Sequence, residues 1–110
     1  MDAKLFAPAE GKTTTVANAT SATAAVALPY DCDMVVLTNS SATAITFVRV
    51  TYYGSASDTM TGAAPTATTD YPILPNQQVR RYVAPGMHKV IRTIASAADG
   101  NIYITPGNRA

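Results

Sequence analysis

The amino-acid sequence predicts an all-β domain, either a sandwich or a barrel. Apolar residues recur with a period of two, which is the period of a strand, and no stretch has convincing helical spacing. The segments with this period number about seven or eight, at roughly 8–12-residue spacing, and turn-forming residues separate them. A chain of 110 residues is long enough for one such domain.

The N-terminal half provides four of the expected strands. Residues 13–19 and 22–28 form the first two, and residues 34–38 are a β-branched run. Residues 42–53 alternate most clearly, and both of their faces are partly apolar, which is typical of a strand inside a two-layer sandwich or at a subunit contact. Because residues 39–41 (Asn-Ser-Ser) are turn formers, we expect 34–38 and 42–53 to pair as a hairpin.

The C-terminal half provides three more expected strands. They cover residues 78–83, 89–95 and 101–105, and each alternates side chains between two faces. Three dipeptides that favour tight turns lie between or after these strands. Pro85-Gly86 follows the first strand, Asp99-Gly100 precedes the last strand, and Pro106-Gly107 marks the expected end of the last strand.

Two segments lack this alternation. Residues 1–12 contain few periodic apolar positions, so we expect an N-terminal arm before a single β-sandwich domain at 13–110. Residues 54–70 are a low-complexity loop in which Met60 is the one large side chain apart from the flanking tyrosines. Loops of this length usually bind something or stay mobile. The loop is therefore either a free surface loop or an extension that becomes ordered against a neighbour.

Composition argues for a protein that is covered by other proteins. The chain is 47% apolar and 14% charged, against roughly 25% charged in an average soluble domain. A net charge of +1 provides no basic field for nucleic acid and no acidic field for cationic substrates. Such a weakly charged surface suits burial in an assembly better than free solution.

The sequence also indicates where the chain is made. No cationic segment followed by an apolar run marks a signal peptide, and no apolar run approaches the roughly 20 residues that span a bilayer. The single cysteine, Cys32, excludes an intrachain disulfide, a bond on which small exported domains usually depend. We expect a protein that is made and folded in a reducing cytoplasm, with no membrane partner.

Residues that could carry chemistry are few. His88 is the one histidine and follows a turn, where a solvated side chain is the ordinary outcome. Cys32 lies between Asp31 and Asp33, but a metal site needs further His or Cys ligands, so a small buried hydrophobe is the expected role. No nucleophile, carboxylate pair or phosphate-binding loop stands out. We predict no catalytic site, no metal and no cofactor.

Candidate protein-contact residues are easier to identify. Arginines inside strands are either guards of a sheet edge against aggregation or anchors of an interface. Tyrosines add amphipathic aromatic surface of the kind that is enriched at protein contacts. Together with the arm and the long loop, these features predict the contact residues Leu5, Phe6, Arg49, Tyr53, Met60, Arg80, Arg81, Tyr82 and Arg92.

Residues 34–107 resemble a group of small tailed-bacteriophage virion proteins. Chains of that group close with an apolar strand, a tight turn and a last strand that runs into Thr-Pro-Gly. A turn that leads into a central hairpin is a further point of similarity. The segments that carry the resemblance are 39–41, 47–49, 73–76, 79–83, 88–91 and 100–107.

The resemblance implies a capsid decoration, or cement, protein. Such a protein is a β-sandwich, often jelly-roll-like, that lies on the shell of the major capsid protein at symmetry axes and reinforces it. The implied partners are the major capsid protein and copies of the chain itself, as a homodimer or homotrimer, with no nucleic acid. The implied location is the capsid surface of the virion, after synthesis in the host cytoplasm. The arm 1–12 and the insertion 54–70 depart from the shorter family pattern.

Two alternative functions remain open. One is another virion component, such as a head fibre base, a connector or a tail subunit. The other belongs to a different class, a carbohydrate-binding β-sandwich that uses tyrosines as stacking platforms. The tyrosines available for such a site are Tyr52, Tyr53, Tyr71 and Tyr82.

Overall fold

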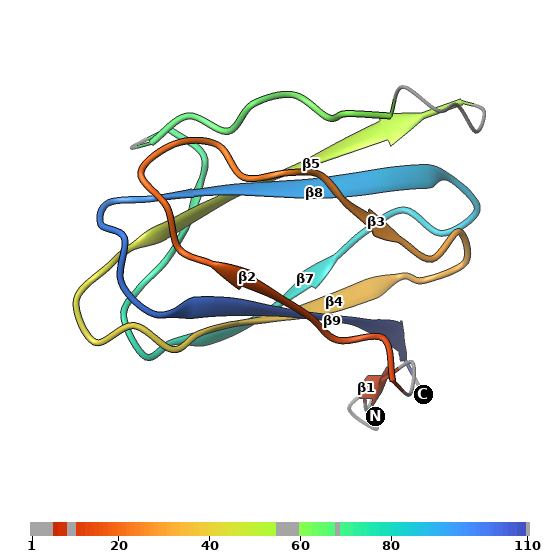
Figure 1. The fold of residues 1–110 in the computed structure, drawn as a ribbon. Helices are drawn as coiled ribbons and strands as arrows, with labels where there is room; N and C mark the ends of the chain where they lie inside the picture. Colours follow the sequence, from red (N-terminus) through yellow and green to blue (C-terminus); the bar gives the residue numbers. More distant parts are fainter. Residues whose placement is uncertain (1–5, 9–10, 55–59, 68, 110) are drawn as a thin grey trace.

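A computed structural model describes residues 6–8, 11–54, 60–67 and 69–109 of the chain. These residues form nine strands and no helix, and every strand pairing is antiparallel (Figure 1). The strands are β1 (Phe6–Pro8), β2 (Thr14–Ala17), β3 (Val26–Leu28), β4 (Met34–Asn39), β5 (Thr46–Tyr53), β6 (Tyr71–Ile73), β7 (Gln78–Tyr82), β8 (His88–Ala95) and β9 (Asn101–Arg109).

The strands form two sheets packed as a sandwich. One sheet has the order β1-β9-β4-β7, with β2 also paired to β9, and the other has the order β3-β8-β5-β6. Four strand pairs are nested along the chain, so that together they form one long antiparallel hairpin: β2–β9, β3–β8, β4–β7 and β5–β6. That hairpin is rolled up so that β9 also lies beside β4 and β8 beside β5. This is the jelly-roll topology, and it confirms the predicted fold class.

The predicted hairpin between residues 34–38 and 42–53 is wrong. β4 pairs with β7 and β9, whereas β5 belongs to the other sheet. Two-residue hairpins need a positive φ, and none of residues 39–41 has one. Instead, Ser41 Oγ accepts hydrogen bonds from the backbone N–H groups of Thr43 and Ala44, at 3.1 and 2.8 Å. These bonds hold an arch that carries the chain from one layer to the other.

Further elements differ from the prediction. The expected strand 22–28 is ordered as a strand only at Val26–Leu28, and the expected strand 42–53 begins at Thr46. β9 does not end at Pro106-Gly107 but continues to Arg109. Pro106 can lie inside this strand because it falls between the stretch of β9 that pairs with β2 and the stretch that pairs with β1. β6, at Tyr71–Ile73, is too short for its periodicity to be recognised from the sequence.

Apolar side chains from both sheets meet in the core. Cys32 is buried among them, which confirms its predicted role as a small hydrophobe. The sheets contribute residues at alternate positions, as the period of two requires. The buried members of this cluster are Leu28, Cys32, Val35, Leu37, Val48, Ile73, Val83, Ile91, Ile102 and Ile104.

One end of the sandwich is locked by a buried polar network. Asn18 Nδ2 donates to Asn39 Oδ1 at 3.2 Å and to the Asp99 carbonyl at 2.8 Å. Thr46 Oγ1 donates to Asn18 Oδ1, and Asn39 Nδ2 donates to the Ala44 carbonyl, both at 2.8 Å. The network joins residues from three connections and two strands, so it fixes how the turns at this end lie against each other.

Candidate protein-contact surface

Residues 60–67, which we call the strap, lie against the outer face of the β3-β8-β5-β6 sheet. In Figure 1 the strap is the green segment that runs alongside β5. It contains no strand, although Pro65 within it is buried. Side chains of β5 and β8 hold it through hydrogen bonds to its backbone. The described part of the long loop is therefore ordered against the chain's own sheet.

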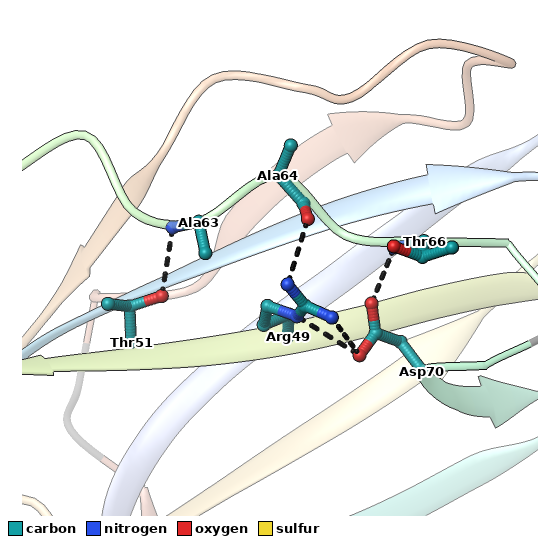
Figure 2. A network of polar contacts seen from close by, with 6 residues as sticks. All are labelled: Arg49, Thr51, Ala63, Ala64, Thr66 and Asp70. Atoms are coloured by element: carbon teal, nitrogen blue, oxygen red, sulfur yellow. Dashed lines mark hydrogen bonds and ion pairs between the residues drawn. The ribbon is translucent and has the colours of Figure 1, made fainter.

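Arg49 forms the centre of this attachment (Figure 2). Its Nε and Nη2 lie 3.1 and 3.0 Å from Asp70 Oδ1, and its Nη1 donates to the Ala64 carbonyl at 3.2 Å. Asp70 Oδ2 accepts a hydrogen bond from the Thr66 N–H. Burial raises the pKa of Asp70, but the Thr66 N–H and the Arg49 guanidinium outweigh it, so that the pKa lies below its usual value.

Two more side chains of β5 bind the strap. Thr51 Oγ1 accepts a hydrogen bond from the Ala63 N–H at 3.0 Å, which Figure 2 also shows. Tyr53 Oη accepts one from the Gly62 N–H at 2.7 Å. Alternate residues of β5 thus project from the outer face and satisfy backbone donors of a segment that has no ladder of its own.

Arg92 of β8 connects the strap to a second segment. Its Nε donates to the Thr23 carbonyl at 2.8 Å and its Nη1 to the Gly62 carbonyl at 3.2 Å. Met60 lines a cleft of about 310 Å³ beside Arg92. Arg49 and Arg92 lie on inner strands, so neither is a guard of a sheet edge. Both guanidinium groups bind the chain's own backbone, a role that the alternation of residues did not reveal.

A second group of predicted residues lies at an open edge of the sandwich. β7 is the last strand of one sheet and β6 the last strand of the other, and no described strand pairs with their outer edges. Tyr82 is 63% exposed and Tyr71 is 50% exposed, values that are high for aromatic side chains. We call the following residues of this edge the edge patch: Tyr71, Leu74, Arg80, Arg81 and Tyr82.

The backbone of this edge is guarded against addition of another strand. Pro72 interrupts the donors of β6, and Arg81 places a charge on the inward face of β7, opposite the buried Val35. Both are devices by which natural sheets avoid edge-to-edge pairing. A partner at this edge would therefore contact side chains of the patch and not extend the sheet.

Arg81 has an unusual environment for a guanidinium group. Its Cζ lies 5.8 Å from the centroid of the Tyr71 ring, within the range of a cation–π contact. Its Nη1 is buried and has no hydrogen-bond partner among the described residues. Buried donors almost always have an acceptor, so this atom requires an explanation.

The remaining predicted contact residues belong to the arm. Leu5 lies outside the described residues. Phe6 begins β1, whose backbone pairs with β9 in the register Phe6↔Arg109, Ala7↔Asn108 and Pro8↔Gly107. Part of the expected arm is thus an extra short strand at the end of β9.

The end of the sandwich near Cys32 contains a buried cation. Lys89 is 1% exposed, and its Nζ donates to the Tyr30 and Met87 carbonyls at 2.9 and 3.0 Å. A signal for this burial was present in the sequence, because Lys89 shares the face of Ile91 in the alternation of β8. The two carbonyl acceptors explain how the charge is accommodated.

Cys32 and His88 also lie near this end. Burial raises the pKa of the Cys32 thiol and outweighs the opposing charge of Lys89, while Asp33 raises it further. The rings of His88 and Tyr30 pack edge to face with centroids 4.7 Å apart. Within the described ranges no group of three or more His, Cys, Asp and Glu side chains could hold a metal ion.

Two clefts are found on the described surface. The larger cleft, of about 450 Å³, lies between the edges of β2 and β3. The described residues that line it are Lys12, Thr14, Ala27, Leu28, Pro29 and Pro106. Ala24, Ala25, Met60, Thr61 and Arg92 line the smaller one. Neither set contains a tyrosine.

Fold and surface together define the class of this molecule: a jelly-roll β-sandwich with a guarded, aromatic edge. In the part of the chain that the structure covers, no helix has the length and apolar character needed to span a bilayer. No protein-family model, no curated protein and no solved structure matches the chain. Its function is therefore inferred from its own residues.

Proposed function

We propose that the chain is a structural virion protein. It binds the outside of a bacteriophage capsid and reinforces the contacts between major capsid protein subunits. The observation that carries this proposal is the edge patch, where the exposed Tyr71 lies on one edge strand, β6, and the exposed Arg80 and Tyr82 lie on the other, β7, at an edge that is guarded against strand addition. Tyrosine and arginine are the residues that most often dominate the energetics of protein interfaces.

The fold supports the same proposal. Jelly rolls occur in viral capsid proteins, and also in lectins and cupins, so the topology alone does not select a function. Lectins and cupins act through a sugar site or a metal site. The residues that the structure describes supply no metal cluster, and no tyrosine is among the described residues that line the two clefts given above. Contact with other proteins is the use that the edge patch supports best.

The energetics of such contacts are favourable for a small domain. A standard interface buries about 800 Å² on each partner, which is roughly an eighth of the 5973 Å² that the molecule exposes. A single domain can therefore contact more than one capsid subunit. Simultaneous contacts convert modest affinities into strong retention, because the second contact is intramolecular once the first has formed.

A binding experiment on capsid shells tests the proposal. The shells are assembled from the major capsid protein encoded in the same genome, and the purified chain is added and sedimented with them. We expect saturable binding and a higher temperature of shell disruption. Tyr82→Ala is expected to weaken binding, whereas Tyr30→Ala, which removes a tyrosine of 47% exposure from the β3–β4 connection, leaves it unchanged. Absence of wild-type binding to the shells would overturn the proposal.

A further inference from the structure

Arg81 is a charged residue in an apolar row. It lies on β7 between Val79 and Val83, which face the core, and it stands opposite the fully buried Val35. As a residue Arg81 is only half-buried, because β7 is the last strand of its sheet. Its guanidinium group therefore lies at the mouth of the space between the two sheets.

The other cations with buried or half-buried side chains are provided with acceptors by the fold. Arg49 binds Asp70 and a carbonyl, Arg92 binds two carbonyls, and Lys89 binds two carbonyls. Arg81 differs from them, since its Nη1 is buried without a partner among the described residues. Leaving a charged donor in this state costs stability.

Acceptors close to Arg81 do not relieve this deficit. Asp70 is the acidic group that attracts Arg81, but its Oδ1 is engaged by Arg49 and its Oδ2 by the Thr66 N–H. Tyr71 offers Arg81 the face of its ring. Among the described residues, the guanidinium therefore lacks one more anionic acceptor.

The geometry identifies the class of that acceptor. A guanidinium presents its donors as a planar fork that matches the two oxygens of a carboxylate. Tyr71, which is half exposed, supplies an apolar wall beside the fork. Arg80, exposed on the same strand, adds positive charge that steers an acidic group to this edge.

We propose that Arg81, with Tyr71 as its apolar wall, receives the carboxylate of an aspartate or glutamate on a loop of the partner protein. The inference rests on the proposed function and identifies the chemistry by which the edge patch recognises the capsid protein. The carboxylate accepts the hydrogen bond that Arg81 Nη1 lacks in the free molecule. Because the unpaired donor destabilises the free molecule, pairing it in the complex adds to the binding free energy.

Shell binding by four proteins tests this inference: wild type, Arg81→Gln, Arg81→Lys and Lys12→Gln. Lys12→Gln is the charge-matched control, because Lys12 is exposed beside the cleft at the opposite edge. We expect Arg81→Gln to weaken binding about tenfold to a hundredfold. Arg81→Lys recovers only part of this loss, since an ammonium cannot form the fork. Lys12→Gln binds like the wild type.

The outcomes separate the two proposals. Wild-type binding with an unchanged affinity for Arg81→Gln would overturn the role of Arg81 and leave the proposed function intact. Absence of wild-type binding would overturn both. A third outcome concerns nucleic acid. If the wild type binds a 20-nucleotide RNA as tightly as it binds the shells, and Arg81→Gln does not bind the RNA, the ligand of Arg81 is a phosphate and the proposal of a carboxylate is overturned. If Arg81→Gln fails to fold, Tyr71→Ala replaces it and is expected to weaken binding to a smaller degree, with unchanged affinity again counting against the proposal.

Discussion

Asn18 and Asn39 are joined by a buried hydrogen bond of 3.2 Å between residues 21 positions apart in the chain. Around this bond, Asn39 Nδ2 also lies within 3.3 Å of the carbonyls of Ala44, Ile73 and Leu74. A single asparagine thus binds the β4–β5 arch to the end of β6, in the other sheet.

Replacement of Asn39 is expected to be severely destabilising. Asn39→Ala removes the acceptor of Asn18 Nδ2 and the donor to several buried carbonyls, which leaves polar groups without partners. We expect a loss of about 2–4 kcal/mol in the free energy of unfolding. Denaturation in urea measures it. Asn108→Ala, at an exposed position of β9, is the matched control, and equal effects of the two substitutions would contradict the prediction.

Acid is expected to loosen the strap. The folded-state pKa of Asp70 lies below its ordinary value, so the Asp70 carboxylate stabilises the fold above the unfolded-state pKa of about 4. This stability is lost as the pH falls through the lower, folded-state pKa. Unfolding measured from pH 6 to pH 2 is expected to show this loss in the wild type and a flatter profile in Asp70→Asn. Arg49→Gln is expected to flatten the profile in the same direction, and identical slopes in all three proteins would refute this account.

The thiol of Cys32 is expected to be inert in the folded protein. Burial and a raised pKa keep it protonated and inaccessible. A disulfide reagent at pH 8 is expected to label Cys32 at the rate of unfolding, and at once in concentrated denaturant. Rapid labelling of the native protein would show that the packing around Cys32 opens more easily than the core cluster implies.

Two glycines with the same backbone conformation are expected to differ in their tolerance of alanine. Gly11 and Gly100 have φ values of +71° and +70°. A Cβ at Gly11 meets nothing within 4 Å, whereas one at Gly100 would lie 2.7 Å from Ser41 Cα. Gly11→Ala is expected to cost about 1 kcal/mol for the backbone alone. Gly100→Ala is expected to cost about 3 kcal/mol, because the arch must also move, and thermal denaturation of both variants measures the difference.

Removal of the Arg81 charge is expected to stabilise the isolated protein. Arg81→Met keeps the length of the side chain and eliminates the buried donor that has no acceptor. We expect a gain of about 1 kcal/mol in the free energy of unfolding, together with more aggregation, because the inward charge guards the edge of β7. Lower stability in Arg81→Met would show that the contact with Tyr71 outweighs the unsatisfied donor.

The candidate contact residues show how much of the site can be predicted from the sequence. Alternation places Arg49 and Arg81 on definite strand faces, and turn dipeptides indicate Pro85-Gly86 and Asp99-Gly100 correctly, with Gly86 and Gly100 at positive φ. Alternation does not reveal which residues cover a face. The strap shields Arg49, while Arg81 lies at an open edge, and the two arginines are equivalent in a one-dimensional pattern.

Sequence alone determined the all-β class, most of the strands and the burial of Cys32, because these depend on side-chain periodicity and on turn chemistry within a few residues. Only the tertiary structure decided that residues 34–38 and 42–53 belong to different sheets and that Thr14 pairs with Ile104. Pairing over such separations depends on which apolar faces pack together once the chain closes on itself, and no local pattern encodes that choice. Among the described residues, the same closure leaves one buried guanidinium nitrogen, Arg81 Nη1, without an acceptor.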